Sequence, residues 1–205
     1  MLRFAGRREV GPEAAEEKPA VFLDRDGTLV HQVGFVNHPA RLRPYPFTAR
    51  AVRALNDRGI PAVVVTNQSG IGRGIITEEV LEKTHERLRR ILALGGAHID
   101  GMYVCPHHPT EGPSPRRCRC RKPGTLLVGR AARELGLDSK RSFFVGDSEA
   151  DILTGRRAGG RTVLVLTGYG RGELNYRRRS WKAEPDHIAV DLEKAVEWIL
   201  ERVGE

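Results

Sequence analysis

The chain has 205 residues, a length that favours a single domain with its own hydrophobic core. It is 40% hydrophobic and 29% charged, with a formal net charge of +8, which is the composition of a globular protein. No apolar run approaches the roughly 18–20 residues that span a bilayer, and the N-terminal residues lack the apolar centre of a secretory signal. We therefore expect a cytoplasmic protein without membrane contact.

Short apolar runs alternate along the chain with segments of helical periodicity. Residues 1–18 carry few apolar side chains and are predicted to be a flexible leader before a single domain at 19–205. Strands are predicted at residues 20–23, 60–65, 101–104, 142–145 and 162–166. Helices are predicted at residues 48–56, 77–94, 125–135, 149–158 and 192–203. The alternation predicts an α/β fold, a Rossmann-like doubly wound parallel sheet covered by helices on both faces.

Two aspartates, Asp24 and Asp26, follow the first predicted strand, and Gly27 after them permits a tight turn. On an extended chain, side chains two residues apart point to the same side. Two like charges this close are costly unless a cation lies between them, and Mg²⁺ prefers such oxygen ligands. Taken alone, the pair is equally well explained as a solvated turn.

Polar residues also lie at the ends of other predicted strands. Thr66 and Asn67 follow the second strand, Asp147 follows the fourth, and Asp151 lies one helical turn further on. Each site has an ordinary structural explanation, such as a helix cap or acids favoured by a helix dipole. Ligands of open parallel sheets bind beyond the carboxyl ends of the strands, so the convergence predicts one crevice that binds a phosphorylated ligand. Lys122, just before a helix, would neutralise phosphoryl charge there.

All three cysteines lie within residues 105–120. This odd number, so closely spaced, is a poor disulfide framework and favours metal binding in a reducing compartment. The spacing Cys-x-His followed by Cys-x-Cys provides a tetrahedral set for Zn²⁺, namely Cys105, His107, Cys118 and Cys120. Four protein ligands leave no open position, so this zinc would be structural and would order the loop. His108 in place of His107, or unligated thiols, are the alternatives.

The motifs around Asp24, Asp26, Lys122 and Asp147, in this order, resemble the haloacid dehalogenase (HAD) superfamily of phosphohydrolases. The resemblance implies that Asp24 is the nucleophile that forms an aspartyl phosphate, and that Asp26 is the general acid and base. It implies a Mg²⁺ held by the Asp24 carboxylate, the Asp26 carbonyl and the Asp147 carboxylate, with Asp151 supporting it.

The zinc loop narrows the resemblance to the D-glycero-D-manno-heptose 1,7-bisphosphate phosphatases and the related histidinol-phosphate phosphatases. In that family the loop stands in for a large cap domain. The substrate contacts that the resemblance implies are Arg25, Gln32, Val33, Gly34, Phe35, Thr66, Asn67, Gln68, Ser69, Arg121 and Lys122. Ser148 departs from the family pattern, because heptose enzymes often carry Lys at that position.

The leading hypothesis is a Mg²⁺-dependent phosphatase that converts D-glycero-D-manno-heptose 1,7-bisphosphate to the 1-phosphate. The alternatives are a histidinol-phosphate phosphatase, a nucleic-acid 3′-phosphatase and an inactive, zinc-ordered binding module. A nucleic-acid enzyme would need aromatic residues among its basic ones, and residues 176–181 offer this only weakly. We therefore expect the partner to be a small phosphorylated metabolite and not nucleic acid. The lack of an obvious extra apolar helix makes a monomer the default expectation.

Overall fold

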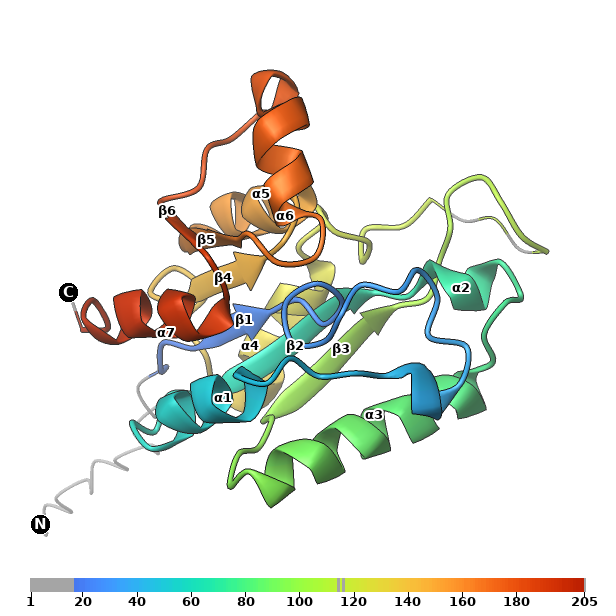
Figure 1. Cartoon of the computed structure of the whole chain (residues 1–205). Helices are drawn as coiled ribbons and strands as arrows, with labels where there is room; N and C mark the ends of the chain where they lie inside the picture. Colours follow the sequence, from blue (N-terminus) through green and yellow to red (C-terminus); the bar gives the residue numbers. More distant parts are fainter. Residues whose placement is uncertain (1–16, 114, 116, 205) are drawn as a thin grey trace, which may run out of the picture.

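A parallel sheet forms the centre of the molecule (Figure 1). The computed structural model describes residues 17–113, 115 and 117–204. Within them the strands are β1 (Val21–Leu23), β2 (Ala62–Asn67), β3 (Gly101–Cys105), β4 (Phe143–Gly146), β5 (Arg161–Val165) and β6 (His187–Ala189). Their order is β3-β2-β1-β4-β5-β6, and every neighbouring pair is parallel. The predicted fold class is confirmed.

The helices alternate with the strands along the chain, and α7 follows the last strand. They are α1 (Thr48–Asn56), α2 (Ser69–Gly72), α3 (Glu78–Leu94), α4 (Leu126–Leu135), α5 (Glu149–Ala158), α6 (Gly170–Gly172) and α7 (Leu192–Leu200). Shorter helical turns are the 3₁₀ turns η1 (Pro39–Arg41) and η3 (Arg178–Ser180) and the π-helix η2 (Glu173–Arg177). The helix predicted at 77–94 begins as expected, because the Thr77 hydroxyl accepts the N–H of Val80 at 3.2 Å.

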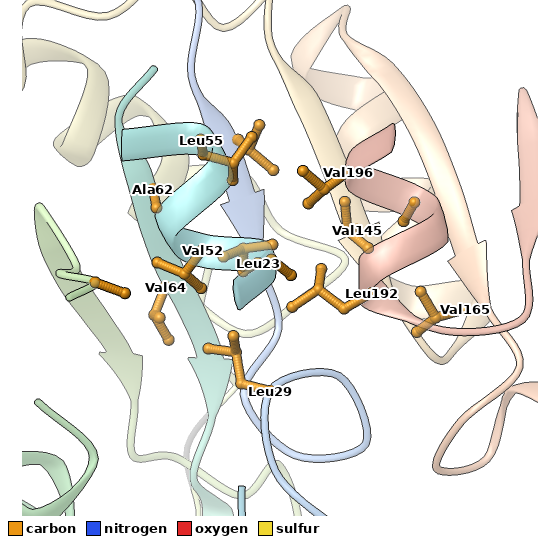
Figure 2. Packing of buried hydrophobic residues seen from close by; sticks show 14 of the residues in the cluster. Leu23, Leu29, Val52, Leu55, Ala62, Val64, Val145, Val165, Leu192 and Val196 are labelled. Atoms are coloured by element: carbon orange, nitrogen blue, oxygen red, sulfur yellow. The ribbon is translucent and has the colours of Figure 1, made fainter. Parts of the chain in front are cut away.

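Alternation along the strands divides the core into two layers. On one face Leu23, Val64 and Val145 pack against α1, α3 and α7, as Figure 2 shows for Val52 of α1 and others. On the other face the aromatic rings of β1 and β4 stack with centroids 4.7 Å apart, over α4. A strand buried on both faces reads as a continuous apolar run, which explains why β1 and β4 are visible in the sequence.

Element boundaries differ from the predicted ones at several points. The second strand begins and ends two residues later than predicted, so that Thr66 and Asn67 lie inside it. It begins after Pro61 because proline has no N–H to donate to the strand ladder. The last helix ends at Leu200 and not at residue 203. Strand β6 and the helical turns at 170–180 were not predicted. They are short, and β6 lies at the sheet edge.

The expected leader, residues 1–18, lies mostly outside the described residues. Lys18 itself is joined to the domain, because its N–H donates to the Gly136 carbonyl at 3.0 Å and its carbonyl accepts the N–H of Asp138 at 2.9 Å. Among the described residues, no helix combines the length and apolarity needed to cross a bilayer. Between β1 and α1 the described chain forms only η1, and no cap domain is present there.

Candidate active site

The sheet order places β1 between β2 and β4, so their carboxyl ends are adjacent. Asp24 follows β1 directly, and its N–H donates to the Val145 carbonyl of β4 at 2.9 Å. Asp147 follows β4, and Asp151 lies in the first turn of α5. Carboxylate oxygens of the three aspartates lie within 4.8 Å of one another. Residues from distant parts of the chain therefore form one acidic cluster.

Lys122 joins two of these carboxylates. Its ammonium Nζ lies 2.8 Å from Oδ1 of Asp24 and 2.6 Å from Oδ1 of Asp151. The lysine is buried, and its backbone is held by the side-chain amide of Asn67. Asn67 Oδ1 accepts the Lys122 N–H at 3.0 Å, and Asn67 Nδ2 donates to the Lys122 carbonyl at 3.3 Å. Asn67 therefore positions Lys122, and its expected contact with phosphoryl oxygens stays a prediction.

The cluster shifts the pKa values of its members. Burial raises the pKa of Asp24 to about 6, against the opposing charge of Lys122. Burial, with the neighbouring charges of Asp24 and Asp151, raises the pKa of Asp147 to about 8. Burial alone would lower the pKa of Lys122, but the Asp151 and Asp24 carboxylates outweigh it and raise that pKa. The Lys122 ammonium is thus insufficient to offset the burial of Asp24 and Asp147, whose pKa values stay raised.

This donor set fits a hard divalent cation, because it consists of oxygen ligands with excess negative charge. Asp147 is held in place by the N–H of Tyr169, which donates to Oδ2 at 2.8 Å. Two glycines come close to the same oxygen. A Cβ atom added to Gly27 would lie 1.9 Å from Asp147 Oδ2, and one added to Gly168 would lie 2.1 Å from it. The turn after β1, where Gly27 has φ +86°, therefore requires glycine.

Asp26 is turned away from this cluster toward Arg25. Arg25 Nη2 donates to Asp26 Oδ2 at 2.7 Å and Nε donates to the same oxygen at 3.1 Å, while Gln68 Nε2 donates to it at 2.7 Å. The Arg25 guanidinium is only 1% exposed and lies 3.3 Å from His85 Nε2 on α3. Burial, followed by the Arg25 charge, lowers the pKa of His85 to about 4, so the ring is neutral and accepts this hydrogen bond. A buried network fixes the Asp26 carboxylate.

A cavity of about 460 Å³ opens over these groups. It is lined by nearly all of the predicted site residues, namely Asp24, Asp26, Gln32, Gly34, Phe35, Thr66, Asn67, Gln68, Ser69, Arg121, Lys122, Asp147 and Asp151. Two residues predicted to contact the substrate do not line this cavity. Arg25 lies buried behind Asp26, and Val33 packs against the core. The sequence analysis missed Tyr169, Glu173 and Arg177, which also line the cavity. Their position in the segment that follows strand β5 could have indicated this, because ligands of parallel sheets bind beyond the carboxyl ends of the strands.

The second cluster consists of Cys105, His107, Cys118 and Cys120, whose ligand atoms all lie within 4.8 Å of one another. The distances that join them range from 3.2 Å, between Cys120 Sγ and Cys118 Sγ, to 3.8 Å, between Cys105 Sγ and His107 Nδ1. Tetrahedral ligands of Zn²⁺ would be roughly 3.5–3.8 Å apart, so the group fits that ion. His108 is used elsewhere, with Nε2 3.0 Å from Arg73 Nη2.

In comparisons with known proteins, a family model, curated relatives and a solved structure all indicate phosphatases of one superfamily. The family described as HAD-hydrolase-like matches residues 119–195. A D-glycero-D-manno-heptose-1,7-bisphosphate 7-phosphatase of Thermosynechococcus vestitus is 40% identical over 89% of this chain and 95% of its own. The D-glycero-beta-D-manno-heptose-1,7-bisphosphate 7-phosphatase of Yersinia pestis is 40% identical over 91% and 92%. The solved D,D-heptose 1,7-bisphosphate phosphatase of B. bronchiseptica, complexed with magnesium and phosphate, is 31% identical over 89% and 98%, with a TM-score of 0.79.

Proposed function

The chain belongs to the family of D-glycero-D-manno-heptose-1,7-bisphosphate 7-phosphatases, and we propose that it hydrolyses the 7-phosphate ester of this sugar bisphosphate. The products are the 1-phosphate and inorganic phosphate. The resemblance predicted from the sequence motifs is confirmed at the level of the family. The observation that carries the proposal is that Asp24, Lys122 and Asp147 meet at one cavity.

Asp24 is the proposed nucleophile. Its carboxylate attacks phosphorus, the bond from phosphorus to the sugar oxygen breaks, and an aspartyl phosphate forms. Asp26 donates a proton to the leaving oxygen and then accepts one from the water that attacks phosphorus. Phosphate leaves and the Asp24 carboxylate is regenerated. Asp26 lines the cavity, and the bonds from Arg25 and Gln68 hold its carboxylate there.

Lys122 and a metal ion would both reduce the repulsion between the negative charges of the site and of the substrate. Lys122 neutralises Asp24 before the reaction, and the same ammonium would contact the phosphoryl group once Asp24 carries it. Mg²⁺ held by the carboxylates of Asp24 and Asp147 and the backbone carbonyl of Asp26 would screen the repulsion between nucleophile and substrate. Zn²⁺ at the cysteine cluster is proposed to be structural. Thiol ligands of this kind persist in a reducing compartment, which supports a cytoplasmic location.

A substrate panel tests the proposal. Phosphate release is measured with and without Mg²⁺ from the heptose 1,7-bisphosphate, histidinol phosphate and a 3′-phosphorylated oligonucleotide, and phosphorus NMR identifies the phosphate that is lost. We expect Mg²⁺-dependent loss of the 7-phosphate from the heptose. Preference for histidinol phosphate or the oligonucleotide would replace this proposal, and no release from any substrate would favour the inactive binding module.

Two Asp→Asn variants test the nucleophile. Asp24→Asn is expected to lower kcat by at least about a thousandfold, because an amide oxygen cannot form the intermediate. Asp57→Asn is the matched control, because Asp57 lies exposed at the end of α1 and does not line the cavity. Normal turnover by Asp24→Asn would refute the assignment.

A further inference from the structure

The segment after β5 is tied to the reacting centre from both sides. The Thr167 hydroxyl donates to the Gly27 carbonyl, in the turn after β1, at 2.6 Å. The N–H of Tyr169 donates to Asp147, in the turn after β4, at 2.8 Å. The helical turns that begin here, drawn in orange in Figure 1, are therefore fixed relative to the carboxylate cluster.

A buried carboxylate extends this connection to Arg177. The N–H of Glu173 donates to the Tyr169 carbonyl at 2.8 Å, and Glu173 Oε1 accepts from Arg177 Nη1 at 2.7 Å. The Glu173 side chain is 9% exposed, whereas that of Arg177 is 68% exposed, and both residues line the cavity. They lie in the π-helix η2, a rare geometry that is frequent at functional sites.

The placement of positive charge indicates what Arg177 can bind. Lys122 is already paired with Asp24 and Asp151 at the reacting end. Two other cations line the cavity, Arg121 from the loop after β3 and Arg177 from the segment after β5. A guanidinium has five N–H donors in a planar fork, so the bond to Glu173 orients Arg177 and leaves donors for a ligand. Neither arginine pairs with a carboxylate of the reacting centre among the described contacts.

We propose that Arg177 binds a second phosphate group of the substrate, distant from the one that is cleaved, and so selects bisphosphates over monophosphates. This inference rests on the proposed function and names a residue that determines its specificity. Bidentate pairing with a phosphate suits a guanidinium, and the cavity of about 460 Å³ lies in the size range of small-ligand sites. Glu173 is the positioning residue for this contact.

The test compares a substrate with its own monophosphate. Steady-state kinetics are measured with zinc-loaded protein and Mg²⁺ on the heptose 1,7-bisphosphate and on the heptose 7-phosphate. For Arg177→Gln we expect the ratio of kcat/KM for the bisphosphate to kcat/KM for the monophosphate to fall about tenfold, mainly through KM for the bisphosphate. Arg177→Lys, which keeps the charge without the fork, should fall between the wild type and Arg177→Gln.

Arg179→Gln is the matched control. It removes the same charge two residues further along the chain, and Arg179 is exposed and does not line the cavity. We expect it to keep the wild-type ratio. An unchanged ratio in Arg177→Gln would overturn the inference while leaving the proposed function intact. Equal losses in Arg177→Gln and Arg179→Gln would overturn it too, because they would indicate the net charge and not one contact. Failure of the wild-type protein to release phosphate from either heptose phosphate would refute the proposed function itself.

Discussion

Lys122 Nζ lies 2.6 Å from Asp151 Oδ1, and both side chains are almost fully buried. The same ammonium lies 2.8 Å from Asp24, so it is shared between a residue of α5 and the proposed nucleophile. Removing one partner of a buried ion pair leaves an uncompensated charge, which is costly in a low-dielectric environment. Asp151 therefore holds Lys122 in place, and its predicted support of the metal stays a prediction.

Lys122→Met tests this shared ion pair. We expect the free energy of unfolding to fall by about 3–5 kcal/mol, because two carboxylates lose their cation, and kcat/KM to fall at least about a hundredfold. Chemical denaturation and phosphate release measure the two effects. The double variant Lys122→Met, Asp151→Asn should regain part of the stability but none of the activity. Equal stability of the single and double variants would contradict the electrostatic explanation.

The stability of the magnesium-free protein should depend on pH. The folded protein holds protons on Asp24 and Asp147 up to pH values of about 6 and about 8, whereas the unfolded chain loses them near pH 4. Between those limits the unfolded state binds fewer protons, so the free energy of unfolding falls as pH rises.

Thermal unfolding of zinc-loaded protein, dialysed free of Mg²⁺, measures this effect at pH 5 and pH 8. We expect the lower Tm at pH 8 and a larger increase in Tm on adding Mg²⁺ at that pH, because the cation no longer competes with protons. Asp147→Asn should flatten both dependences. A Tm that rises from pH 5 to pH 8 without Mg²⁺ would be inconsistent with the carboxylate cluster.

Gly27→Ala should disable the site sterically. The added Cβ would lie 1.9 Å from Asp147 Oδ2, so the carboxylate must move and kcat/KM should fall at least about a hundredfold. Gly59→Ala is the control. Gly59 has a similar positive φ of 65° but no heavy atom within 4 Å, so it should lose only about 1–2 kcal/mol of stability and keep its activity. Equal kinetics of the two variants would contradict the proposed close approach.

Two neighbouring histidines distinguish the zinc ligands. His107→Ala should reduce the zinc content below one equivalent and expose residues 105–120 to proteases, because three ligands hold the ion less well. His108→Ala should retain zinc, since His108 contacts Arg73 and not the sulfur atoms. Metal analysis by mass spectrometry after gel filtration measures both. Loss of zinc from His108→Ala alone would reverse the assignment.

The sequence predicted the parts of the fold that depend on local pattern. Helices α1 and α5 have the predicted bounds, because apolar spacing and flanking glycines define them within a few residues. Strand β6 carries three residues at the edge of the sheet, too few for a periodic signal. The site residues next to the central strands were predicted because their motifs are contiguous.

Roles that depend on contacts between distant segments could not be read from the sequence. Nothing local indicates that Asn67 clamps the backbone of Lys122, or that His85 on α3 lies under Arg25. The same holds for Arg177, which belongs to a basic run whose other members do not line the cavity. Long-range packing brings these groups together, and one sequence does not record it.

The strand order separates the carboxylates proposed to break the phosphate ester from the arginines proposed to select the substrate. The carboxylates extend from the central strands β1 and β4, whereas the loop with Arg121 leaves β3 and the segment with Arg177 leaves β5. Grafting these two outer connections from another member of the family would retarget the protein to a different phosphate ester. Such a graft must keep Lys122, which follows Arg121 in the same loop, and Tyr169, whose N–H holds Asp147.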